Sequence, residues 1–116
     1  MTVVIETLDD FNNAISSAKY VIIQFFMKFV YEENNMMDFL LTLQEEYGEK
    51  GIDIKVYHVF VDKMRDLARE LKVMSFPTFG FYISGKLHDE RMITGFNNNQ
   101  TENIIRKRLE SIIQER

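Results

Sequence analysis

The sequence contains no cysteine and no tryptophan, and it has only one proline and five glycines among 116 residues. The absence of cysteine excludes disulfide bonds, cysteine-ligated zinc and a thiol nucleophile. The glycines are scattered along the chain, which excludes a glycine-rich phosphate-binding loop. No apolar run approaches the ~20 residues of a membrane-spanning helix, so we expect no membrane partner.

An excess of positive charge is also absent, since 14 lysines and arginines are outnumbered by 18 acidic residues and the formal net charge is -4. The sequence therefore lacks the basic footprint of a nucleic-acid-binding protein. The longest basic run, 106–108, lies between Glu102 and Glu110 and is typical of a solvated helix face. The acidic pairs 9–10 and 45–46 have no third ligand at loop spacing, so we expect no metal site. No motif indicates another cofactor.

The length and a hydrophobic content of 46% predict one folded domain over residues 1–116. The first residues lack the positive region of a secretory signal, and Glu6 interrupts them early. On this basis we expect a cytoplasmic location.

Strand and helix patterns alternate along the chain. Strands are predicted at Val3–Glu6, Tyr20–Phe26, Ile54–Val61, Thr78–Ile83 and Lys86–Thr94. Helices are predicted after the N-cap Thr7 and at Glu32–Tyr47, Met64–Leu71 and Thr101–Arg116. The pair Ser84-Gly85 is typical of a two-residue hairpin turn. The order βαβαβαββα predicts an α/β fold with a central mixed sheet flanked by helices.

This order, together with the segment Val73–Phe79, resembles the thioredoxin family over nearly the whole chain. The resemblance implies that the peptide bond before Pro77 is cis and that Pro77 faces the former active site. Asp62 matches the family's strand-end aspartate, Gly85 its hairpin glycine, and Gly95 the glycine that walls the substrate groove.

The family's active-site motif aligns with this chain without gaps. Its four central residues fall on Val30, Tyr31, Glu32 and Glu33, and its two cysteines are replaced by Val30 and Glu33. The resemblance therefore implies a vestigial motif with no catalytic residue.

Two positions beneath the motif also depart from the family. Gln24 stands where the family has a buried proton-accepting aspartate, and a glutamine cannot take a proton at neutral pH. His58 matches a nearby lysine of the family. The resemblance implies loss of the proton relay together with the sulfurs, and we interpret His58 as a satisfied core histidine.

Several aromatic side chains map to the loops around the family's substrate groove. The groove residues implied by the resemblance are Phe29, Tyr31, Phe76, Pro77, Gly95 and Phe96. The aromatic members either plug the groove or form an exposed patch for an interaction, and we favour the patch. Glu32 and Glu33 either stabilise a helix N-terminus or attract a basic partner.

The sequence thus predicts a redox-inactive module, not an enzyme, that recognises a protein or peptide through the vestigial groove. One alternative is a structural or accessory subunit of a larger assembly. Another is an enzyme of a non-redox class that uses His58 or a carboxylate. Self-association through the aromatic groove is a further possibility.

Overall fold

Strand β2, Tyr20–Phe26, forms the centre of the molecule, and all seven of its residues are buried. It belongs to a computed structural model that describes residues 4–27, 34–74, 77–88 and 92–114. The run is rich in β-branched and aromatic residues, which is typical of a strand covered on both faces.

The sheet is mixed, and its strand order is β1-β3-β2-β4-β5, with β6 also paired to β4. The other strands are β1 (Val4–Ile5), β3 (Ile54–Phe60), β4 (Thr78–Ile83), β5 (Lys86–Leu87) and β6 (Ile93–Thr94). Strands β1, β3 and β2 run parallel, whereas β4 is antiparallel to β2. Both β5 and β6 are antiparallel to β4.

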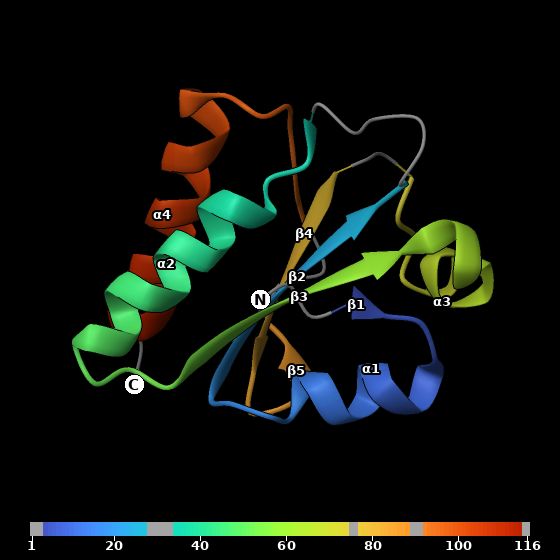
Figure 1. Ribbon diagram of the computed structural model, residues 1–116, viewed down its shortest axis with the longest axis horizontal. Helices are drawn as coiled ribbons and strands as arrows, with labels where there is room; N and C mark the ends of the chain where they lie inside the picture. The colour runs from blue at the N-terminus through green and yellow to red at the C-terminus, as the bar shows by residue number, and fades with distance from the viewer. Residues whose placement is uncertain (1–3, 28–33, 75–76, 89–91, 115–116) are drawn as a thin grey trace.

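Helices cover both faces of this sheet. Figure 1 shows α2 (Met37–Glu49) and α4 (Asn99–Gln114) on one side, and α1 (Leu8–Ile15) and α3 (Arg65–Glu70) on the other. A short 3-10 turn, η2 (Val61–Lys63), joins β3 to α3. Within the described residues, no helix is long and apolar enough to cross a bilayer.

Two hydrophobic clusters result from this layering, because successive strand residues point to opposite faces. Ile22 packs with Leu40 and Ile105 beneath α2 and α4. Its neighbour Ile23 belongs to the second cluster, which includes Phe11 of α1. The predicted α/β class and flanked mixed sheet are therefore confirmed.

Several local predictions are confirmed as well. The bounds of β2 and β4 are those expected from the sequence. The Thr7 side chain accepts a hydrogen bond from the Asp10 backbone N–H at 3.1 Å, as an N-cap does. Ser84 and Gly85 have φ values of 51° and 84°, which fit the predicted hairpin turn.

The bounds of two helices were predicted wrongly. Helix α2 begins at Met37 and continues to Glu49, instead of spanning 32–47. Residues 32–33 lie outside the described residues. Helix α4 begins at Asn99, before the expected Thr101, because the Asn98 side chain accepts from the Thr101 backbone N–H at 2.9 Å. The other bounds differ by one or two residues.

The single strand predicted over Lys86–Thr94 is also wrong, since it is two short strands. Leu87 pairs with Tyr82 and Ile93 with Phe79. Between these two pairs, β4 advances by three residues, from Phe79 to Tyr82, whereas its partner segment advances by six, from Leu87 to Ile93. The partner segment therefore contains three more residues than β4 over the same stretch. The described pairings of β5 and β6 with β4 therefore do not belong to one continuous ladder.

A glycine exchange tests the hairpin turn. We expect Gly85→Ala to lower the free energy of unfolding by about 1–2 kcal/mol, because φ at Gly85 lies in the left-handed region. Gly48→Ala is the matched control, since Gly48 lies within α2 and an added Cβ would meet nothing within 4 Å. The free energy of unfolding of Gly48→Ala should rise by about 0.5–1 kcal/mol. Urea unfolding measures both, and equal effects would contradict the assigned turn.

Candidate functional site

The structure describes half of the predicted groove. Gly95, Phe96 and Pro77 are described. The predicted positions Phe29, Val30, Tyr31, Glu32, Glu33 and Phe76 lie outside the described residues. The expectation of a cis bond before Pro77 also involves Phe76 and stays a prediction.

The three described groove residues lie together at the end of β4. Thr78, next to Pro77, pairs with Thr94 of β6, and the Thr94 hydroxyl donates to the Pro77 carbonyl at 3.0 Å. Pro77 is buried, whereas Phe96 exposes 66% of its surface. Phe96 is therefore an exposed side chain and not a plug.

Gly95 allows this loop to approach α4 closely. A Cβ at Gly95 would lie 2.6 Å from the Thr101 side-chain oxygen, in the first turn of α4. The helix start and the loop therefore fit only without a side chain at position 95. This close contact sets the path of the loop that carries Phe96.

Gln24 anchors the beginning of α2 from beneath. Its side chain is completely buried, and its Oε1 accepts from the Met36 backbone N–H at 2.7 Å. Its Nε2 donates to the Asn35 Oδ1 at 3.0 Å, and that oxygen also accepts from the Met37 N–H at 2.9 Å. Gln24, at the position where the resemblance implies a proton acceptor, therefore has a structural role. We call its hydrogen bonds to Asn35 and Met36 the Gln24 clip.

Asn34 and Asn35 also form hydrogen bonds with the loop after β6. The Asn97 backbone N–H donates to Asn34 Oδ1, and the Asn97 side chain donates to the Asn35 carbonyl, both at 3.4 Å. Sequence reasoning missed these asparagines. Their type was the available signal, since asparagine often bonds nearby backbone in turns and helix caps.

His58 lies beside Gln24, with the two residues paired across β2 and β3. It is 2% exposed, and its ring lies 4.4 Å from the Phe60 ring and 5.5 Å from the Phe26 ring, centroid to centroid. Burial lowers its pKa from 6.5 to about 4, so the imidazole is neutral at neutral pH.

The interpretation of His58 as a satisfied core histidine was half right. The residue is in the core, but its buried Nε2 has no hydrogen-bond partner among the described residues. The buried Asp62 Oδ1 likewise has no hydrogen-bond partner among the described residues. The His58 side chain is also shielded from solvent, since the residue is 2% exposed.

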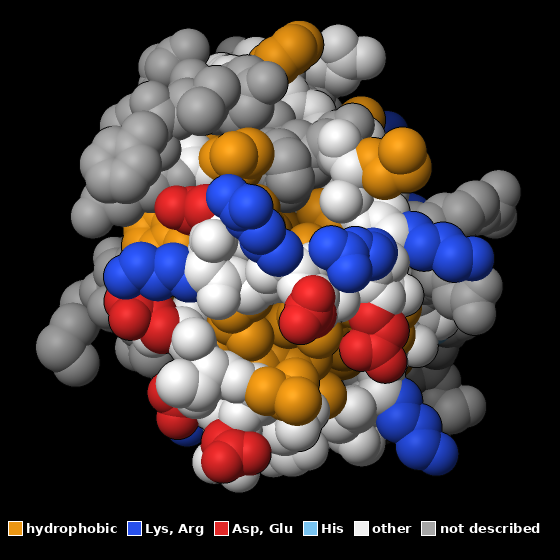
Figure 2. Space-filling model, turned by 90° about the vertical axis from the view of Figure 1, so that its right-hand side faces the viewer, with side chains coloured by type: hydrophobic (Ala, Val, Ile, Leu, Met, Phe, Trp, Pro, Cys, Tyr) orange, Lys and Arg blue, Asp and Glu red, His pale blue; other side chains and the backbone are white. Residues whose placement is uncertain are grey.

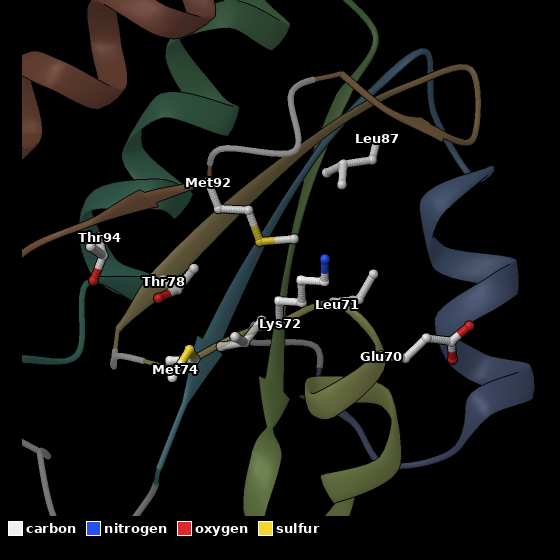
Figure 3. Close-up of a pocket in the computed structure, with 9 residues that line it drawn as sticks. Glu70, Leu71, Lys72, Met74, Thr78, Leu87, Met92 and Thr94 are labelled. Carbon is white, nitrogen blue, oxygen red and sulfur yellow. The ribbon is translucent and has the colours of Figure 1, made fainter.

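Two surface hollows share Lys72, Val73 and Met74 in their linings, and neither was predicted from the sequence. One, of about 490 Å³, is also lined by Thr78 of β4 and by Met92, next to β6. In Figure 3 the side chains of Lys72 and Met92 point into this hollow. The other, of about 550 Å³, lies over α3.

No group of three or more histidine or acidic residues within the described part of the chain could hold a metal ion. The site therefore presents exposed apolar surface and backbone hydrogen-bonding groups to a ligand.

The comparisons with known proteins agree with this geometry. The sequence model of the family described as Thioredoxin matches residues 2–109. This chain belongs to the thioredoxin family. It is 31% identical over 109 residues to a protein named thioredoxin from Coprinus comatus, a match covering 94% of this chain and 99% of the relative.

Solved thioredoxins share the fold. Mitochondrial thioredoxin 3 from Saccharomyces cerevisiae superposes with a TM-score of 0.75 at 23% identity, covering 95% of this chain and 94% of that one. Thioredoxin from Trypanosoma brucei brucei gives a TM-score of 0.77 at 19% identity, covering 99% and 93%. Our chain is thus a thioredoxin-family domain without a single thiol.

The Gln24 clip predicts a stability effect. Gln24→Leu removes the acceptor of the buried Met36 N–H, so the free energy of unfolding should fall by about 1–3 kcal/mol. Gln100→Leu, at an exposed position of α4, is the control and should change it by less than about 0.5 kcal/mol. Denaturant unfolding compares them, and a neutral Gln24→Leu would mean that the clip adds no stability.

His58 predicts a pH effect. Its folded pKa, about 4, lies below 6.5, so between these values the unfolded state binds more protons. The contribution of His58 to the free energy of unfolding is therefore fully present above about pH 6.5. It is lost as the pH falls toward 4, by up to about 1.4 kcal/mol per pH unit. His58→Phe should lack this loss. The measurement is urea unfolding of both proteins across this range, and parallel curves would contradict a neutral buried His58.

Proposed function

We propose that this chain is a redox-inactive thioredoxin-like module that binds a protein or peptide through the vestigial groove, and that it is not an enzyme. Disulfide exchange requires thiolate attack, and the chain has no thiol. Gln24, whose amide nitrogen and oxygen are hydrogen-bonded to Asn35 and Met36, cannot act as a proton acceptor at neutral pH.

One observation supports binding above all. Among the described large hydrophobic residues, the two most exposed are Met74, at 87%, and Phe96, at 66%. Met74 precedes Pro77 by three residues, and Phe96 follows the strand paired beside Pro77. Apolar surface is costly to leave in water, and such patches on small domains commonly mark interaction sites.

A partner would use both kinds of group that the site offers. Met74 and Phe96 would supply apolar contacts, and an extended peptide could pair with backbone groups near Pro77 as an added strand does. The alternatives are weaker. His58 is too deeply buried to act on a substrate. An accessory subunit, or a second copy of this chain, would use the same apolar patch.

An affinity experiment tests the proposal. Tagged wild type, Phe96→Ser and Leu8→Ser are compared for the proteins that they retain. Leu8, 56% exposed on α1, is the matched control because it is equally apolar and lies on a different element. We expect Phe96→Ser to weaken retention by roughly 1–3 kcal/mol and Leu8→Ser to leave it unchanged.

Three controls accompany it. Insulin reduction by the pure protein should match the blank, and activity above the blank would contradict the redox-inactive assignment. Thermal unfolding of each variant shows whether lost retention reflects lost folding. Sedimentation tests self-association. If Phe96→Ser folds normally and retains every partner as tightly as wild type, the groove is not the binding surface.

A further inference from the structure

The hollow of about 550 Å³ over α3 combines an apolar floor with a cationic rim. The apolar lining comes from Met27, which follows β2, from Ala68 of α3, and from Val73, which follows α3. Arg65, Arg69 and Lys72 line the same hollow. Figure 2 shows the Lys and Arg side chains of this face as a band, with hydrophobic side chains on both sides of it.

The cations form a row and not a cluster. Arg65 and Arg69 are one helical turn apart on α3, and Lys72 follows at its end, so the row is roughly 10 Å long. An extended chain rises about 3.3 Å per residue, so such a row spans about three residues of a peptide. A linear ligand therefore fits it better than a compact one.

The charge of the lining is positive overall. Asp62 is the one acidic residue among the described lining residues, against three cations. Arg69 lies 3.6 Å from Asp66, but both side chains are largely exposed, so that pair is weak. Among the residues that the structure describes, Arg65 and Lys72 have no carboxylate partner. An acidic ligand would complement this rim.

Lys72 also occupies a backbone position that favours glycine. Its φ is 59°, and α3 ends in a Schellman motif, with Lys72 N–H bonded to the Arg69 carbonyl and Val73 N–H to the Ala68 carbonyl. Glycine is the usual residue at this position, because a side chain there is strained. The lysine is thus present despite a local cost to folding, and local strain often marks a functional site.

We propose that this hollow binds an extended acidic segment of a partner protein, with one apolar side chain of that segment seated between Met27, Val73 and Met74. The inference rests on the proposed function, because Met74 belongs to both the hollow and the exposed patch near Pro77. It specifies the partner's chemistry, which is opposite to the basic partner that Glu32 and Glu33 favour in the sequence.

The test begins with selection of short random displayed peptides on the immobilised protein. We expect enrichment of Asp and Glu next to a large apolar residue. The consensus peptide, labelled for fluorescence polarisation, is then titrated with wild type, Lys72→Gly, Lys72→Arg and Arg65→Gln. Lys107→Gln, an exposed lysine on α4, is the control for net charge.

Lys72→Gly separates binding from folding. It should weaken the consensus peptide about threefold to tenfold, while its thermal midpoint stays equal to or rises above that of wild type. Lys72→Arg should keep the affinity, Arg65→Gln should lose a similar factor, and Lys107→Gln should lose little. The wild-type affinity should fall as salt rises, since the rim charges are exposed.

The outcomes distinguish this inference from the proposed function. Enrichment of basic or uncharged peptides, or no enrichment, overturns the acidic segment. So does an acidic consensus whose affinity is unchanged by both Lys72→Gly and Arg65→Gln. If those peptides lose affinity with Phe96→Ser alone, the groove binds and the hollow does not. If neither Phe96→Ser nor the hollow variants weaken any ligand, both proposals fail.

Discussion

The double-sided burial of β2 is the constraint on which the rest of the structure depends. All seven residues of the strand are out of water, so its backbone groups must pair with β3 and β4, and its side chains fill both cores. Gln24 is the one polar side chain in that strand. A buried amide must find partners for its oxygen and its nitrogen, and it finds them in Met36 and Asn35. One side chain thereby sets where α2 begins.

The floor of the sheet at Gln24 and His58, which pair across β2 and β3, is uncharged at neutral pH. Gln24 carries no titratable group, and burial keeps His58 neutral at neutral pH. Both side chains thus avoid the cost of holding a charge in the core. A site that exchanges protons would need a charge there during its cycle, whereas a binding surface needs only a stable shape. The neutral floor is consistent with the loss of both sulfurs.

Local signals explain why much of the fold could be predicted. The apolar runs of β2 and β4 gave their bounds, and Ser84-Gly85 gave the turn, because each depends on neighbouring residues. The start of α2 could not be predicted in this way. Glu32 and Glu33 resemble a first helical turn, but the start is set by Gln24 and by contacts to Asn97, which are distant in sequence.

The candidate site shows the same limit. The sequence placed Pro77, Gly95 and Phe96 in one groove, and β6 does pair beside Pro77. The exposure of Phe96 depends on how the loop from β6 enters α4, and the close contact of Gly95 with Thr101 determines this path. The hollow over α3 was not predictable, because its floor joins the end of β2 to the end of a helix some 40 residues later.

Three residues near Pro77, in sequence or across the sheet, carry a local cost to folding, as do Ser84, Leu8 and His58 elsewhere in the chain. Lys72 has a left-handed backbone, and Met74 and Phe96 expose large apolar side chains. The interior, by contrast, is well packed around β2. Sequences that fold well are consistent at every level except where function requires otherwise. The proposed binding of a partner would account for the costs at Lys72, Met74 and Phe96, because the partner would cover the two apolar side chains and pair the lysine.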